Sequence, residues 1–332
     1  ERIREHRTVL VAQDTTDLRF VRRGSGDERL GLKVHSALCV SLEGVPLGIV
    51  HQQEWVRKPE DTGKAKRRRQ LETKNKESQR WLDTLDETLG AIPASIGAIT
   101  VADREADIYD LFALPRRPGS ELLIRAEHNR RVNDNGYLRE TVQQAPVAGQ
   151  YTFTVQRKED VPARQATMSV RFTQVMVQPP RNRRGRSALP AVAINLVLAQ
   201  EEAAPAGVKP VQWLLLTTLA VTTFGDALRC VRWYSYRWLI ERFHYVLKSG
   251  CKIEERQLES ADRMKRAIPT FSIVAWRLLW LTLQARETPE TSCTMILEER
   301  EWQALYAKVH GTEQLLATPP TLREAVRMIA QL

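Results

Sequence analysis

Short runs of apolar and β-branched residues, divided by polar stretches, mark the first part of the chain. The run RTVLVAQDTTDLRF (7–20) predicts a strand that stops at the polar AQDTTD. Two further runs, LGLKVHSALCVSLEG (30–44) and PLGIVHQQEWV (46–56), are joined by the turn-like EGVP. Their spacing predicts three strands in meander order.

A helical period follows a basic, polar connection, KPEDTGKAKRRRQ (58–70). The next run, GAITVAD (97–103), is largely apolar, which is typical of a short strand buried on both faces. It leads directly into a helical segment, READIYDLFAL (104–114), and then into another apolar strand, ELLIRAE (121–127). The helix after the basic connection carries one apolar stripe, formed by Trp81, Leu82, Leu85 and Leu89.

The pattern changes again after about Asn129. Four segments up to Thr218 read as antiparallel strands, split by Pro- and Gly-bearing loops that include the cationic PPRNRRGR (179–186). Helical patterns then return, and two more lie around Leu305 and Ile329.

This order of elements is the one expected of a ribonuclease H-like fold with an insertion before its last helix. We therefore predict an α/β chain with a ribonuclease H-like core, an all-β insertion and a helical C-terminal tail. The predicted parts are 1–128 (core, first part), 129–218 (β-strand insertion), 219–286 (last core helices) and 287–332 (helical C-terminal region, expected to be truncated).

The stretch YSYRWLIERFHYVLKSG (234–250) combines an apolar face with a narrow polar one. On a wheel of 100° per residue, its polar residues project within an arc of about 60°. The stripe holds one carboxylate between cations. It is either a solvated stripe with an Arg–Glu pair at i,i+4 or a metal-binding carboxylate with cations aimed at phosphates. The polar positions are Tyr234, Arg237, Glu241 and Lys248, and the opposite face has Leu239, Ile240, Phe243, Val246 and Leu247.

Two aspartates stand where predicted strands end, Asp14 after the first and Asp103 after the buried one. Ligand sites in α/β sheets gather at the carboxyl ends of strands, and these two strands are neighbours in a ribonuclease H-like order. Simpler roles are also open, because Asp103 could cap the following helix and Asp14, like Asp17, could belong to a turn. A metal site requires both aspartates to converge with Glu241.

Charge and cysteine usage narrow the class of protein. The 50 Lys and Arg residues exceed the 40 Asp and Glu residues, which gives a net charge of +10 that fits a polyanionic partner. The four cysteines are far apart and lack CxxC spacing, so neither a zinc site nor a disulfide framework is predicted. No run approaches the roughly 20 apolar residues of a membrane span, and no signal peptide is visible. We therefore expect a cytoplasmic protein, and the missing initiator Met suggests a fragment or a processed form.

The motifs resemble one known family. The spacing Tyr234-x2-Arg237-x3-Glu241-x6-Lys248 matches the Y-R-E-K signature of bacterial insertion-sequence-four transposases, the family of the transposon-five transposase. VAQDTT resembles that family's first-Asp motif, and DREAD (103–107) resembles its second. Four further segments also resemble sequence segments of this family: VHSALCV, HQQEW, NKESQRW and WLLLTT.

The resemblance implies cut-and-paste DNA transposition in the bacterial nucleoid by a DDE active site. Asp14, Asp103 and Glu241 would be the catalytic carboxylates and would hold two Mg²⁺ or Mn²⁺ ions. The implied partners are double-stranded DNA, as transposon terminal repeats and target, and a second copy in a homodimeric synaptic complex. The implied DNA-binding residues are Tyr234, Arg237, Lys248, Trp213, Arg104, Arg125 and Arg256, with Trp213 stacking on a flipped base.

Some positions depart from the family pattern. Tyr245 stands where the best-known member has a second basic residue, and Leu214 replaces its His after the stacking Trp. The segment CKIEERQLES is shifted by one residue, which weakens the correspondence of Arg256 and Gln257. Without the resemblance, Trp213 would be read as a core residue of an apolar strand. The family's N-terminal DNA-binding domain is absent, so we expect a catalytic core.

Two other functions share parts of this evidence. A non-catalytic or domesticated relative would bind DNA or a partner transposase without cleaving. A metal-dependent repair nuclease would cleave without needing a specific terminal repeat.

Overall fold

The structure is a computed structural model, and it describes residues 1–21, 29–56, 77–133, 136–155, 163–180, 189–256, 260–314 and 316–332. The basic connection 58–70, most of the cationic loop 179–186, and Gln257 lie outside the described residues. The chain divides into two compact units: unit 1 contains Glu1–Arg19 and Leu30–Glu241, and unit 2 contains Phe20–Arg29 and Arg242–Leu332.

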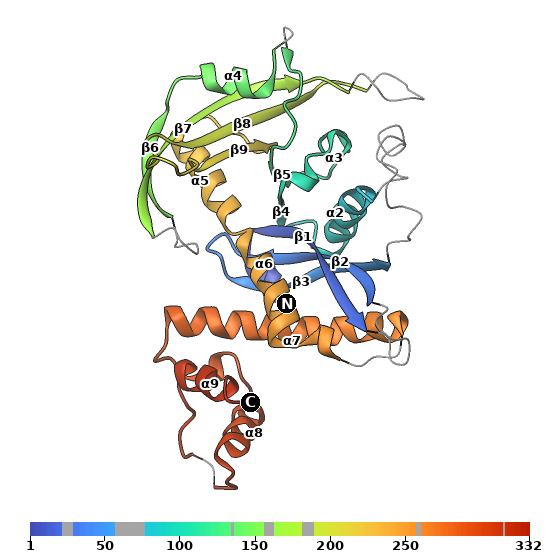
Figure 1. The fold of residues 1–332 in the computed structure, drawn as a ribbon, viewed down its shortest axis with the longest axis vertical. Coiled ribbons are helices and arrows are strands. Elements are labelled where there is room, and N and C mark those ends of the chain that lie inside the picture. The colour runs from blue at the N-terminus through green and yellow to red at the C-terminus, as the bar shows by residue number, and fades with distance from the viewer. Residues whose placement is uncertain are drawn as a thin grey trace. The chain divides into compact units, whose positions relative to one another are not determined.

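Strands form one mixed sheet in the described part of unit 1 (Figure 1). The sheet order is β3-β2-β1-β4-β5-β9-β8-β7-β6. β1, β4 and β5 run parallel to one another. The pairs β5–β9, β9–β8, β8–β7 and β7–β6 are antiparallel. The strands are β1 (Thr8–Val21), β2 (Arg29–Val40), β3 (Pro46–Val56), β4 (Gly97–Ala102), β5 (Ser120–Arg125), β6 (Gly149–Val155), β7 (Arg164–Val177), β8 (Val192–Glu201) and β9 (Gln212–Thr217).

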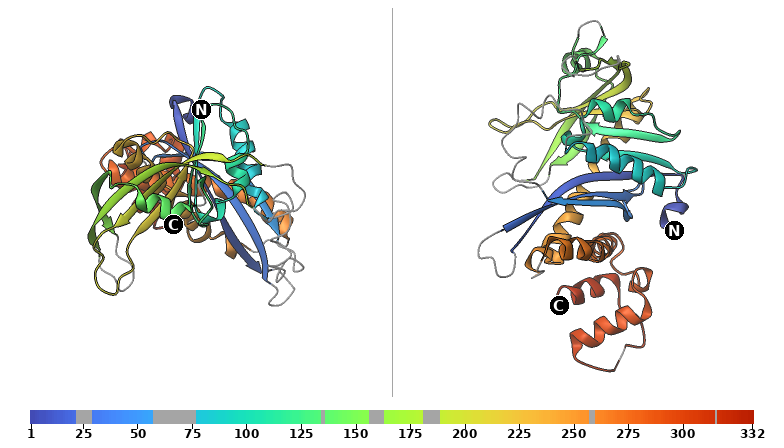
Figure 2. Two further views of the ribbon diagram at one scale, coloured as in Figure 1. Left: turned by 90° about the horizontal axis from the view of Figure 1, so that it is seen from above. Right: turned by 90° about the vertical axis from the view of Figure 1, so that its right-hand side faces the viewer.

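The predicted strands are present, but the first is longer than expected. β1 runs through AQDTTD to Val21 instead of stopping there, because Leu18 is fully buried and the alternation of faces continues past the polar residues. The sheet twists strongly: from above, the blue strands β1–β3 and the yellow-green strands β7 and β8 run in different directions (Figure 2).

Helices cover both faces of this sheet. In Figure 1, α2 and α3 lie on one side of β4 and β5, whereas α5 lies on the other. α2, α3 and α4 share a core cluster with alternate residues of β5 and β9, such as Leu122 and Leu216. The helical elements of unit 1 are η1 (Arg2–Glu5), α2 (Gln79–Ala91), η4 (Arg104–Ala106), α3 (Tyr109–Ala113), α4 (Leu138–Gln144), α5 (Phe224–Ser235) and the start of α6 (Trp238–Tyr245).

Two helical expectations in unit 1 were wrong in detail. The segment 104–114 is not one helix: a 3-10 turn, η4, is followed by the short α3, and Asp107 between them is turned inward to bind Arg130. The region 129–218, predicted to be all-β, also holds α4, whose Leu138 and Val142 are buried. The strands of this region continue the same sheet through the β5–β9 pairing. The boundaries predicted at 128, 218 and 286 stay predictions.

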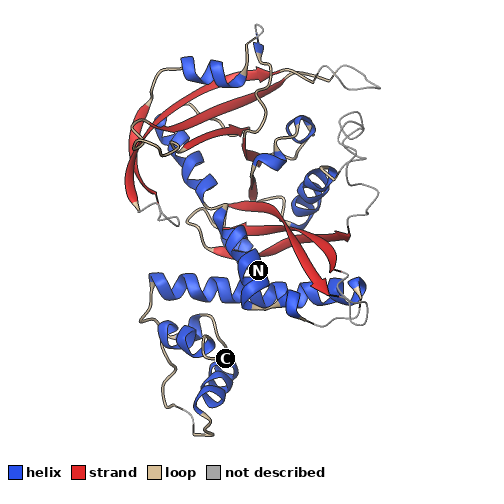
Figure 3. Cartoon of the chain, viewed as in Figure 1, coloured by secondary structure: helices blue, strands red, loops and turns tan. Residues whose placement is uncertain are grey.

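The elements of unit 2 after Glu241 that the structure describes are helical (Figure 3). The two helical patterns expected in the tail are present, and they pack around Trp302, Cys293 and Leu281. No described helix combines the length and the apolar character needed to cross a membrane. The elements are the end of α6, the π-helical turn η6 (Val246–Gly250), η7 (Ile253–Glu255), α7 (Ala261–Glu287), η8 (Cys293–Met295), α8 (Glu299–His310) and α9 (Leu322–Ile329).

Candidate active site

Asp14 and Asp103 are matched positions on two adjacent parallel strands. β1 and β4 pair in register up to Gln13 and Ala102; Asp14 is the next residue of β1, and Asp103 directly follows the end of β4. Because neighbouring strands lie about 4.8 Å apart and matched residues share a face, the two carboxyl groups leave the sheet side by side. The face is the one opposite to Val9 and Val11, which pack in the core cluster beneath α2.

The third carboxylate comes from α6. Its apolar side, with Leu239, Ile240 and Phe243, is almost completely buried, so Glu241 is directed away from the core. Glu241 remains 53% exposed and accepts a bond of 2.5 Å from the Arg237 guanidinium, one turn earlier. The predicted i,i+4 ion pair is thus present.

Asp103 and Glu241 both affect the ionisation of Asp14. The pKa of Asp14 is raised to about 7, first by burial and then by the nearby carboxylates of Asp103 and Glu241. The backbone N–H of Thr15 and the positive charge of Arg237 oppose this rise. Two carboxylates that are far from Asp14 in sequence therefore act on its carboxyl group within unit 1.

Each carboxylate also has a local hydrogen-bond donor. Asp103 accepts from the backbone N–H of Glu105 at 2.9 Å and caps η4, so the capping role considered from the sequence is realised. Asp14 accepts from the Thr15 N–H at 2.9 Å. The turn role for Asp14 and Asp17 was wrong, because both lie within β1. Within the described ranges, no three His, Cys, Asp or Glu side chains are arranged as a metal-binding group.

Arg80 is a component of the site that the motif comparison did not single out. Its Nε donates to Thr15 Oγ1 at 3.0 Å, and its Nη2 pairs with Glu105 at 2.5 Å. Burial lowers the pKa of this guanidinium, and several acids, among them Asp103 and Asp14, oppose that change. The only sequence signal was its place inside NKESQRW, which does not reveal what Arg80 contacts.

A second cluster lies on α5 and β9. Tyr234 is only 4% exposed, so its predicted place in the polar stripe was wrong. Its ring meets Trp213 edge-on at 5.6 Å between centroids, and the Arg237 guanidinium lies 6.0 Å from the Tyr234 ring centre. Burial raises the pKa of Tyr234, and the charges of Arg237 and Arg125 oppose this rise.

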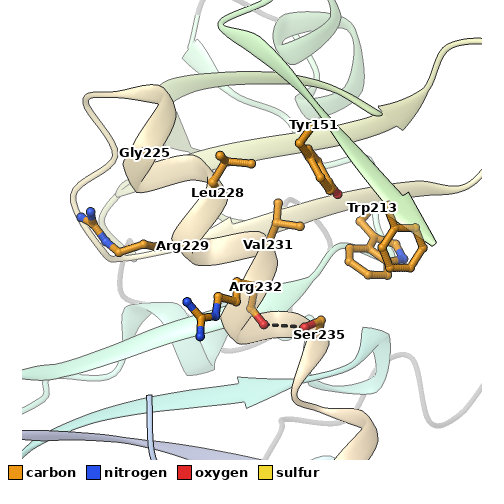
Figure 4. A pocket seen from close by; sticks show the side chains of 9 residues that line it. Tyr151, Trp213, Gly225, Leu228, Arg229, Val231, Arg232 and Ser235 are labelled. Atoms are coloured by element: carbon orange, nitrogen blue, oxygen red, sulfur yellow. Dashed lines mark hydrogen bonds between the residues drawn. The ribbon is translucent and has the colours of Figure 1, made fainter. Parts of the chain in front are cut away.

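Trp213 lines an apolar pocket of about 390 Å³ (Figure 4). Trp213 is half-buried, so it is neither a fully enclosed core residue nor a free surface ring. In Figure 4 the aromatic residues lie on one side of α5, and the side chains of Arg229 and Arg232 extend toward the other. The pocket is lined by Tyr151, Phe153, Trp213, Gly225, Leu228, Arg229, Val231, Arg232 and Ser235.

The other predicted arginines of unit 1 differ in their exposure and partners. Arg104 begins η4, is 54% exposed and lies 3.7 Å from the Glu127 carboxylate. Arg125 ends β5 and donates to the Gln212 carbonyl at 3.1 Å, which holds it next to the strand of Trp213.

The remaining predicted residues belong to unit 2. Lys248 lies in η6, where the helix widens to a π turn, so the regular wheel used to place it was wrong beyond Tyr245. Arg256 donates to the Cys251 carbonyl at 3.2 Å and lies 5.3 Å from the Phe271 ring centre. The pKa of His244 is lowered to about 3, mainly by burial and also by the charge of Lys248.

Comparison with known proteins adds the family. The model of the transposase DDE domain matches residues 6–275. A structure described as the piggyBac transposase synaptic complex with hairpin DNA is similar at 8% identity and a TM-score of 0.40. That similarity covers 97% of this chain and 57% of the other, so this chain spans little more than half of the piggyBac chain. The match of the transposase domain to most of the chain shows that the protein belongs to the DDE transposase family.

Proposed function

We propose that this chain is the catalytic domain of a cut-and-paste DNA transposase, which cleaves at transposon ends and joins those ends to target DNA. The observation that carries the proposal is the matched pair Asp14 and Asp103 on parallel strands, acted on by the carboxylate of Glu241. The double-stranded DNA of the terminal repeats and the target would be the substrates, and a second copy would complete a synaptic dimer.

The finer fold assignment is part of this proposal. The strand order β3-β2-β1-β4-β5, with β1, β4 and β5 parallel, supports a ribonuclease H-like core. The Y-R-E-K spacing supports membership of the insertion-sequence-four branch, and Glu241 of that motif is one of the two acids that raise the pKa of Asp14.

The three acids suit divalent metal ions. Hard cations such as Mg²⁺ and Mn²⁺ prefer carboxylate oxygens, and Asp14, Asp103 and Glu241 offer only such donors. When bound, a pair of these ions would activate water or a 3′ hydroxyl and stabilise the leaving oxygen of an in-line displacement. Asp14 must lose its proton to serve as a ligand, and Glu241 must turn from Arg237.

Arg237 then becomes free to donate to phosphate oxygens. An arginine released from a carboxylate offers planar, charge-assisted donors that match a phosphate. We assign phosphate contacts also to Tyr234, Lys248, Arg104, Arg125 and Arg256, on the strength of the family resemblance.

The pocket beside Trp213 suits an unstacked base. Unstacking a base costs a few kcal/mol, and stacking of the base on an aromatic side chain offsets about 1–3 kcal/mol of that cost. The half-buried ring of Trp213, with Phe153 5.9 Å away between centroids, supports that role.

The proposal is tested by nicking of supercoiled plasmid in MnCl₂. Replacing Glu241 with Ala is expected to reduce nicking by at least about 100-fold, because one ligand of the reacting assembly is lost. Glu87→Ala, which removes an exposed acid of α2, should nick like the wild type. DNA binding, measured by fluorescence anisotropy, should be kept in Glu241→Ala. Equal nicking by Glu241→Ala and wild type would refute the site, and absence of nicking in all three proteins would favour a DNA-binding relative without catalysis.

A further inference from the structure

The Arg80 side chain is held from three directions at the edge of the carboxylate site. Nε donates to Thr15 Oγ1 at 3.0 Å, Nη1 to the Glu77 carbonyl at 2.8 Å, and Nη2 to the Glu105 carboxylate at 2.5 Å. The side chain is only 12% exposed. A guanidinium held at all three nitrogens has one orientation, unlike a solvated surface arginine.

Two tryptophan rings add to this restraint. The Arg80 guanidinium carbon lies 5.3 Å from the ring centre of Trp81 and 5.7 Å from that of Trp55. Both distances lie within the range of cation–π attraction, which is stronger for a partly desolvated cation. The charge is therefore kept in place beside the acids despite the cost of burial.

Thr15 links Arg80 to Asp14 and to a buried histidine. The Thr15 hydroxyl accepts from Arg80 Nε, so its single proton is available for His35 Nδ1, 2.9 Å away. His35 is fully buried, and its Nδ1 shares one hydrogen bond with this hydroxyl, whose direction depends on the tautomer of the imidazole. The backbone N–H of Thr15 meanwhile donates to Asp14 Oδ1 at 2.9 Å. The position of the Asp14 carboxyl is thus tied to the Arg80–Thr15–His35 chain.

We propose that Arg80 is a positioning residue for the Asp14–Asp103 pair and sets the affinity of that pair for divalent cations. The inference rests on the proposed metal-dependent function. Arg80 attracts both carboxylates, which offsets their mutual repulsion before a metal ion binds. The same charge repels an incoming dication. Loss of the charge therefore tightens metal binding but loosens the geometry that catalysis needs.

The opposite effects expected on Mn²⁺ affinity and on the rate of nicking distinguish this role of Arg80 from a purely structural one. Arg80→Gln keeps a donor for Thr15 and removes the charge. We expect it to lower the MnCl₂ concentration for half-maximal thermal stabilisation by about 3–10-fold, while nicking at saturating MnCl₂ falls by about 10-fold or more. Arg80→Lys keeps the positive charge but loses the planar guanidinium group and its several N–H donors. It should therefore bind Mn²⁺ like the wild type and still nick DNA slowly.

Arg116→Gln is the matched control. Arg116 is also a partly buried arginine whose pKa is lowered by burial, and it donates to backbone carbonyls of Leu111, Phe112 and Leu114. Its removal should lower the melting temperature but leave the Mn²⁺ midpoint unchanged. A second test is Thr15→Val, which should slow nicking without tightening Mn²⁺ binding, with recovery in Thr15→Ser.

The possible outcomes distinguish a failure of the role assigned to Arg80 from a failure of the proposed metal-dependent function. If the wild type binds Mn²⁺ and nicks DNA, but Arg80→Gln keeps the wild-type midpoint and rate, the role of Arg80 is overturned while the proposed function stands. If Arg80→Gln weakens Mn²⁺ binding, the repulsive effect is also overturned. Should Arg80→Gln fail to fold, unequal Mn²⁺ midpoints of Arg80→Lys and wild type would overturn it. A wild type that binds no Mn²⁺ overturns both.

Discussion

Asp14 illustrates how a side chain acquires its chemistry from residues far away in the chain. Nothing in AQDTTD indicates an unusual acid, yet burial and two other carboxylates raise the pKa of Asp14 to about 7. Below about pH 7, Asp14 of the metal-free protein therefore carries a proton that must leave when a cation binds.

This shift predicts how stability depends on pH. In the unfolded chain Asp14 ionises near its ordinary pKa of 3.8, whereas in the folded chain it keeps its proton until about pH 7. The folded state therefore binds more protons between these values, and the free energy of unfolding falls as pH rises from about 4 to about 7. Asp14→Asn cannot lose a proton, so it should lack this decrease and melt about 2–6 °C above the wild type at pH 8 in EDTA.

The measurement is a thermal melt of both proteins from pH 5 to pH 8. Asp17→Asn is the control, because Asp17 lies in the same strand but is 59% exposed and paired with Lys33. Parallel pH profiles of Asp14→Asn and wild type would contradict the raised pKa.

At the scale of elements, the hydrophobic pattern located most helices and strands but not their interruptions. The apolar face predicted from 234–250 is buried at Leu239, Phe243 and Leu247. The segment is nevertheless two helices and a π turn, because the α-helical pattern breaks after Ser235 and again after Tyr245. A break changes the direction of each later residue, so a wheel that assumes one helix misplaces both ends.

Lys248, which lies in the π turn η6, is one of the residues proposed to contact DNA. A lysine that binds phosphate through charge alone should contribute to affinity whatever the base sequence. Lys248→Ala is therefore expected to weaken binding to duplexes of different sequence by similar factors. It should also reduce the slope of log affinity against log salt concentration by about 1.

The slope is measured by anisotropy titrations in increasing NaCl. Lys308→Ala, at an exposed lysine of α8, serves as the comparison for a general loss of charge. Equal slopes for Lys248→Ala and wild type would remove Lys248 from the DNA contacts.

At the scale of the whole molecule, the residues proposed for cleavage and those proposed for DNA binding do not all belong to the same unit. The three acids and Arg237 belong to unit 1, whereas Lys248 and Arg256 belong to unit 2. The transposase domain match extends across residues of both units. The net charge of +10 provides a long-range attraction for DNA that does not depend on any one of these residues.

This division predicts where metal binding stabilises the chain. A ligand that binds only the folded state adds about 2.7 kcal/mol of stability at 100 times its dissociation constant. In hydrogen exchange with mass spectrometry, MgCl₂ should slow exchange in β1, which contains Asp14, and in β4, which directly precedes Asp103. It should leave α8 and α9 unchanged.

Glu241→Gln in the same experiment should lose most of the effect on β1 and β4. Equal slowing in β1, β4, α8 and α9, or slowing that persists in Glu241→Gln, would contradict a metal site built on these acids.

The sequence by itself determined most of the strands and helices and proposed Asp14, Asp103 and Glu241 as site residues, because periodicity and motif spacing are local properties. Only the tertiary structure decided that Gln13 pairs with Ala102, which sets the two aspartates side by side. It also decided that Tyr234 is buried and that Arg80 reaches Thr15. Register, burial and the pKa of Asp14 depend on segments that are distant along the chain, and no local pattern records which of them meet.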